Sequence, residues 1–149
     1  MKKSTRKLRD KLKEAFEVQG FRYFLNKKTM EVISYPDHEA WYDTEFIEAN
    51  YTEVTNNPDD FLEIRRLSNR ELYILMEDFI ETVGNKHVQG LLMEALNRKT
   101  AFRQFRYVLE DTHMLDKWLD FKNHRYNELA ERWIDDNIYQ KQTPSSVPS

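Results

Sequence analysis

The chain has 149 residues and a net charge of −3, and 40% of its residues are hydrophobic against 33% charged. This length suits one domain, and the balanced composition, with only 3 Gly and 4 Pro, excludes a collagen-like, low-complexity or wholly disordered protein. The chain has no cysteine, which excludes disulfides, thiolate nucleophiles and iron–sulfur clusters and suits the cytoplasm. We therefore expect a cytoplasmic protein with a single domain over residues 1–140 and a disordered tail over residues 141–149.

The charges fall into three blocks. Residues 1–13 carry seven cations and one acid, residues 29–64 carry ten acids and no Lys or Arg, and residues 95–109 carry four cations and no acid. No apolar stretch follows the basic N-terminus, and no segment approaches the ~20 apolar residues that cross a bilayer, so we expect neither secretion nor a membrane role. Any account of partners must explain this layout of opposed charges.

The N-terminal half predicts a helix followed by a small antiparallel sheet. The runs 21–25 and 30–35 are rich in β-branched and aromatic residues and are joined by a polar connection, which is typical of a hairpin. A third short strand could follow at 61–67. The preceding helix is predicted over 4–19, ending near Gly20, because apolar residues recur there at helical spacing: Leu8, Leu12, Ala15 and Phe16.

The acidic segment between these strands, residues 36–60, predicts a loop or a short helix. Its aromatic residues Trp41, Phe46 and Tyr51 argue against a free tail. We therefore expect the segment to lie against the domain.

From residue 68 onwards the pattern predicts about four helices, which makes the fold class α+β. Ser68 and Glu71 have the spacing of a capping box, a second helix begins near Asn85, and Thr100 can cap a third, short helix. The fourth helix, about 113–138, carries an apolar stripe that is predicted to be buried: Leu115, Trp118, Leu119, Tyr126, Leu129 and Trp133.

No catalytic, cofactor or metal motif is complete in this sequence. Neither glycine-rich phosphate loop is present, and His38-Glu39 lacks the second histidine of a zincin motif. His124 has acids four residues to each side, but helical geometry places it opposite the apolar stripe, on the solvent face. Adjacent carboxylates on a helix point ~100° apart and do not converge as an acid and a base must. We expect no enzyme and no cofactor, although a site assembled from scattered residues stays open.

The basic cluster at 98–106 is the strongest candidate surface. Cations in the first turn of a helix add to the positive potential of its free amides and create a local anion trap. The residues predicted to bind an anion or a partner are Arg98, Lys99, Arg103, Arg106 and Tyr107. Alternatively, the ten acids of 29–64 fold back and neutralise this cluster inside the protein. Lys122, within the apolar stripe, either extends to solvent or meets a buried acid.

These observations favour a non-catalytic protein-interaction domain that binds a protein partner or a second copy of itself, with no small-molecule substrate. The alternative is a nucleic-acid-binding protein that uses the basic N-terminal arm and the 98–106 cluster. Its affinity would fall steeply with salt, because binding the phosphate backbone releases counterions.

Two segments carry motifs of a known family: AFRQFRYVL (101–109) is similar to an AFRRFK-x-VL segment, and the hairpin resembles a YLD-x-x-TGEV pattern. Both patterns are those of Uncharacterised Protein Family 0158, small bacterial proteins without an assigned function, which the chain therefore resembles. The resemblance covers about residues 8–137 and implies no catalytic residue and no cofactor. Met30 and Thr100 stand where the family pattern has glycine. If the turn at Met30 still needs a positive φ, the methionine costs about 1–2 kcal/mol there.

Overall fold

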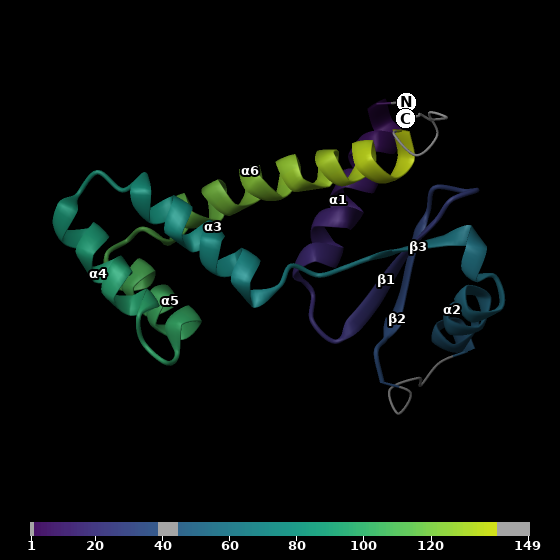
Figure 1. The fold of residues 1–149 in the computed structure, drawn as a ribbon, viewed down its shortest axis with the longest axis horizontal. Coiled ribbons are helices and arrows are strands. Elements are labelled where there is room, and N and C mark those ends of the chain that lie inside the picture. The colour runs from purple at the N-terminus through teal and green to yellow at the C-terminus, as the bar shows by residue number, and fades with distance from the viewer. Residues whose placement is uncertain (1, 39–44, 140–149) are drawn as a thin grey trace, which may run out of the picture. The chain divides into compact units, whose positions relative to one another are not determined.

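The computed structural model describes residues 2–38 and 45–139, and the chain divides into two compact units. Met1–Leu67 and Leu129–Ser149 form the first, which we call the sheet unit, and Ser68–Glu128 form the second, the helical unit. The helices and one small antiparallel sheet confirm the α+β class (Figure 1). A single domain over 1–140 stays a prediction, and the predicted tail lies outside the described residues.

The sheet has three antiparallel strands in the order β2-β1-β3. The predicted hairpin is confirmed as β1 (Phe21–Asn26) and β2 (Val32–Pro36), and the third strand as the shorter β3 (Phe61–Ile64). β1 is the central strand, so that Leu25 lies opposite both Val32 and Leu62. A short 3-10 helix, η2 (Pro58–Asp60), leads into β3.

The hairpin turn keeps a left-handed residue although it has no glycine. Asn26 Oδ1 accepts hydrogen bonds from the amides of Lys28 at 2.8 Å and Thr29 at 3.1 Å, and the Asn26 amide donates to the Glu31 carbonyl at 2.8 Å. Met30 has a φ of 65° in this turn. The turn therefore needs the conformation that favours glycine, and the Met30 backbone is strained there because the residue has a Cβ.

The predicted loop or short helix over 36–60 contains a helix of 12 residues, α2 (Glu45–Asn56), which packs beside the sheet (Figure 1). The Tyr35 ring stacks on Phe24 with centroids 5.4 Å apart and meets Tyr51 edge-on at 5.3 Å. Tyr51 thus holds α2 to the sheet, as expected. Phe46 does not, because it is 73% exposed, and Trp41 lies outside the described residues.

Helix α1 (Lys2–Glu17) confirms the predicted N-terminal helix, and all four of its predicted apolar positions are buried. Several of its polar residues have partners in the same unit. Tyr23 Oη donates to Glu14 Oε2 at 2.9 Å, and Arg9 Nη1 donates to Glu131 Oε2 at 2.7 Å. Burial, together with the hydrogen bond and negative charge of Glu14, raises the pKa of Tyr23 well above its usual range. Part of the charge of the basic arm is therefore paired within the sheet unit.

The helical unit contains α3 (Asn69–Glu81), α4 (Lys86–Leu96), α5 (Ala101–Asp111) and the first part of α6 (Leu115–Ile134). The predicted capping box is present, since Ser68 Oγ accepts from the Glu71 amide at 3.1 Å and the Ser68 amide donates to Glu71 Oε1 at 2.8 Å. Asn85 caps α4 by accepting from the Val88 amide at 3.0 Å. After Ile134 the chain continues as a π-helical turn, η3 (Asp135–Tyr139).

Phe79 is the centre of the core of the helical unit. Its ring makes edge contacts with Trp118 and Phe121, each at a centroid distance of 5.4 Å, and with Phe105 at 6.5 Å. These contacts join α3, α5 and α6. Leu119, predicted to be buried with Trp118, is instead 41% exposed.

Candidate binding pocket of the helical unit

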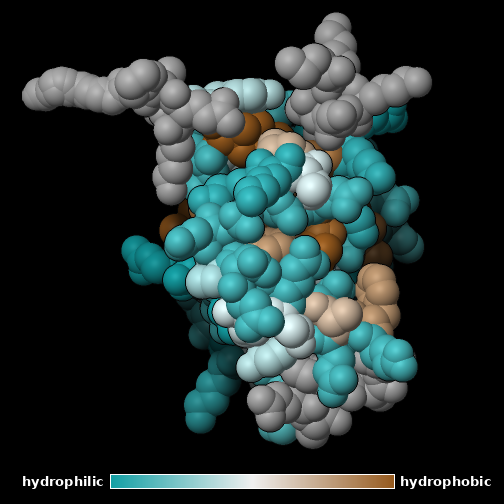
Figure 2. Space-filling model, turned by 90° about the vertical axis from the view of Figure 1, so that its right-hand side faces the viewer, coloured by the Kyte–Doolittle hydropathy of each residue, from teal (hydrophilic) through white to brown (hydrophobic). Residues whose placement is uncertain are grey.

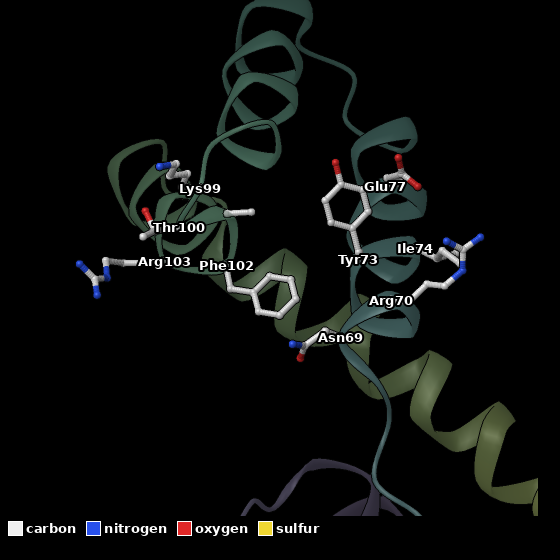
Figure 3. A pocket seen from close by; sticks show the side chains of 10 residues that line it. Asn69, Arg70, Tyr73, Ile74, Glu77, Lys99, Thr100, Phe102 and Arg103 are labelled. Atoms are coloured by element: carbon white, nitrogen blue, oxygen red, sulfur yellow. The ribbon is translucent and has the colours of Figure 1, made fainter.

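A pocket of about 740 Å³ lies between α3 and the start of α5 (Figure 3). One wall is the N-terminal half of α3, which the capping box fixes, and the other is the α4–α5 connection with the first turn of α5. Both walls belong to the helical unit. The lining residues are Asn69, Arg70, Tyr73, Ile74, Glu77, Lys99, Thr100, Ala101, Phe102 and Arg103.

Two aromatic rings point into the pocket from opposite walls. In Figure 3 the Tyr73 side chain extends from α3 and that of Phe102 from α5, both toward the space between the helices. Tyr73 Oη donates to the Leu96 carbonyl at 3.3 Å, which also satisfies a free carbonyl at the end of α4. Ile74 lines the same pocket and is exposed. The pocket therefore offers apolar and aromatic surface to a ligand.

The charged residues of the pocket are mostly cations. Arg70 on α3 and Lys99 and Arg103 on the α5 side are all exposed, and Glu77 is the acid among the lining residues. Within the part of the chain that the structure describes, none of these three cations makes an ion pair. The lining charges sum to +2. The rim of the pocket thus favours an anionic group.

The first turn of α5 adds to this positive potential. Thr100 occupies the N-cap position, but the prediction that it caps the helix is wrong, since its side chain makes no cap hydrogen bond. Its ψ of 55° differs from the extended conformation of a capping residue, and its Oγ1 accepts from Gln104 Nε2 at 3.2 Å instead. The first turn contains no acid either. The amides at the start of α5 are therefore not neutralised by a side chain of their own turn.

The structure places only some residues of the predicted binding surface at the pocket. Lys99 and Arg103 line the pocket, whereas Arg98 and Arg106 form ion pairs along the chain, with Glu94 at 4.0 Å and Glu110 at 3.0 Å. Tyr107 is 59% exposed and lines a smaller hollow of about 340 Å³ on α5 with Val108, Glu110 and Asp111. Of the predicted set, Lys99 and Arg103 line the same pocket.

Sequence reasoning missed the α3 wall of the pocket. Tyr73 and Ile74 lie outside the buried face of α3, and the signal available in the sequence was two bulky residues among the polar residues of this helix. The hypothesis that the acids of 29–64 neutralise the basic cluster stays a prediction. The ion pairs described for that segment join Asp60 to Lys28 at 3.5 Å and Glu63 to Arg22 at 3.0 Å, within the sheet unit.

The described residues hold no group of three or more His, Cys, Asp or Glu side chains that could bind a metal ion. His124 is exposed, as predicted. Lys122 is half-buried, with its Nζ 5.8 Å from the centroid of the Tyr126 ring. No helix in the described part of the chain is long and apolar enough to span a bilayer.

Comparison with known proteins shows the family. The model of an uncharacterised protein family, UPF0158, matches residues 4–148. The chain belongs to UPF0158. A relative, UPF0158 protein PA5073 of Pseudomonas aeruginosa, is 32% identical over 98 residues, which are 63% of this chain and 64% of the relative. The match thus spans less than two thirds of that UPF0158 protein, and no solved structure matches the chain.

Proposed function

We propose that this UPF0158 protein is a non-catalytic binding domain that takes a peptide segment of a protein partner into the pocket between α3 and α5. The segment carries carboxylates and an aromatic or large apolar side chain. The observation that carries the proposal is the pairing of two inward-pointing rings, Tyr73 and Phe102, with a rim of net positive charge. The proposed setting is the cytoplasm, where a chain without cysteine needs no disulfide.

The rings and the positively charged rim of the pocket suit the two kinds of group in such a segment. An aromatic or apolar side chain between the rings gains buried apolar area and an edge or stacking contact. A carboxylate at the rim gains from Lys99, Arg103 and the free amides of α5. Neither part needs a reaction, and a short segment of a protein can supply both groups.

The test is fluorescence anisotropy with labelled peptides of glutamate and alanine that carry one central phenylalanine. Two matched peptides replace the phenylalanine with alanine or the glutamates with lysine. We expect the acidic phenylalanine peptide to bind most tightly and Arg103→Glu to weaken this binding at least tenfold, about 1.4 kcal/mol. Arg106→Glu is the control, because Arg106 lies on the same helix outside the pocket. Equal binding to wild type and Arg103→Glu would show that the pocket is not the site.

Nucleic-acid binding is the alternative, and Arg6, Lys7 and Lys11 on the exposed side of α1 favour it. The same assay with labelled duplex DNA at rising salt separates the two. Steep, salt-dependent DNA binding together with no binding of the acidic peptide would favour this alternative over our proposal.

A further inference from the structure

The acidic helix α2 carries an exposed phenylalanine that its own unit does not bury. Phe46 is 73% exposed, more than the other large hydrophobic residues that the structure describes as exposed. It lies in the first turn of α2, next to Glu45 and two turns before Glu53, and both acids are also exposed. The helix carries three acids and no Lys or Arg. The face that Figure 2 shows is predominantly hydrophilic, with scattered apolar side chains between.

Helical geometry places this ring on the outer side of α2 together with carboxylates. At 100° per residue, Glu53 lies about 20° from Phe46 and Glu45 about 100° to the same side. The sheet-facing Val54 lies about 80° to the other side and is buried. The surface that α2 presents to solvent is therefore one aromatic ring among acids.

This surface has the chemistry that the pocket of the helical unit selects. The pocket offers two rings, three cations and the uncapped start of α5, with a net charge of +2. The α2 surface around Phe46 offers one ring and two carboxylates, those of Glu45 and Glu53. Phe46 can enter between Tyr73 and Phe102, while Glu45 and Glu53 approach Lys99 and Arg103. Both the charges and the apolar groups are complementary.

Resting on the proposed function, we infer that the pocket binds α2 of a second copy of this chain. The occupant is the surface formed by Glu45, Phe46 and Glu53. If each copy binds α2 of the other, the two identical contacts close a dimer. Each contact joins one helix to one pocket and is small, so the association depends on concentration and weakens with salt.

Sedimentation velocity on the full chain tests this, from about 1 µM to about 500 µM, the range of weak association. We expect wild type to shift from monomer to dimer over this range and salt to reverse the shift. Phe46→Ala and Arg103→Glu should each raise the dissociation constant at least tenfold. The matched controls are Tyr107→Ala and Arg106→Glu, which change an exposed ring and a cation outside both surfaces and should leave the dissociation constant unchanged.

A mixing experiment identifies which surfaces meet. Arg103→Glu has an intact α2 but a defective pocket, whereas the double variant Glu45→Lys, Glu53→Lys has an intact pocket but a defective α2. We expect each variant alone to stay monomeric and their mixture to form heterodimers through the one complementary contact. Failure of the mixture to associate, or a wild type that stays monomeric, would overturn the inference. If monomeric wild type still binds the acidic phenylalanine peptide through Arg103, the proposed function stands and only the second copy is excluded as partner.

Discussion

Relief of the strain at Met30 should stabilise the hairpin. Its φ of 65° lies in the left-handed region, which costs a residue with a side chain about 1–2 kcal/mol and glycine almost nothing. Against this gain, glycine adds about 0.5–1 kcal/mol of freedom to the unfolded chain. The Met30 side chain is exposed, so its removal forfeits little apolar burial. We therefore expect Met30→Gly to raise the free energy of unfolding by about 0.5–1 kcal/mol.

Urea denaturation followed by circular dichroism measures this difference. The adjacent Glu31→Gly is the matched control, because Glu31 is exposed and does not have a positive φ. That substitution should lower the free energy of unfolding by about 0.5–1 kcal/mol. Met30→Asn should also stabilise, since asparagine tolerates the left-handed region. A Met30→Gly protein no more stable than Glu31→Gly would refute the reasoning.

Three further substitutions test interactions within one unit or the other. Gly90 lies within α4, and a Cβ there has no neighbour within 4 Å, so Gly90→Ala should stabilise by about 0.5–1 kcal/mol in urea denaturation. Arg125 pairs with Asp78 at 3.0 Å, and because both side chains are about two-fifths exposed, Arg125→Ala should destabilise by only about 1 kcal/mol in the same assay. Burial and Glu14 hold the pKa of Tyr23 above its ordinary 10.0, so its contribution to stability is complete below pH 10 and is lost as the pH rises further. Tyr23→Phe should therefore reduce the loss of stability measured above pH 10, and an unchanged alkaline profile would contradict this.

The elements whose formation depends on residues close together in the sequence could be predicted. The apolar face of α1, the capping box and the hairpin need only local spacing and turn chemistry. The buried face of α6 could not, because its residues belong to the helical unit as far as Glu128 and to the sheet unit from Leu129 onwards. Trp118, Tyr126 and Ile134 are buried at angles that drift around the helix by about 160°. A prediction based on one straight stripe ignores this drift and therefore places Leu119 in the core, although it is exposed.

The candidate site was predictable on one wall only. Charge counting finds Lys99 and Arg103, because cations at the start of a helix stand out against local electrostatics. The opposite wall is distant in sequence, and a single sequence does not record that Tyr73 and Phe102 line the same pocket. Nor does the sequence show that Arg98 and Arg106 form ion pairs with acids nearby in the chain. An arginine with an acid four residues away can either pair with that acid or remain in solvent.

At the start of α5, folding and the proposed binding favour opposite charges. Arg103 is the third residue of α5 after the N-cap Thr100, a position where an acid is favourable and a cation is not. Arg103→Glu replaces a cation by an acid in the first turn of α5, where the helix dipole favours negative charge. We expect the variant to gain about 0.5–1 kcal/mol in the free energy of unfolding. The same substitution should abolish binding at the pocket.

Urea denaturation and the peptide assay, run on the same preparation, measure both effects. Arg106→Glu is the control, because it replaces the ion pair with Glu110 by a repulsion and should lower stability by a few tenths of a kcal/mol with no loss of binding. A residue kept for stability would show the opposite result for Arg103→Glu, a less stable protein. A more stable protein that no longer binds would mean that the cation at the start of α5 opposes folding and serves a ligand.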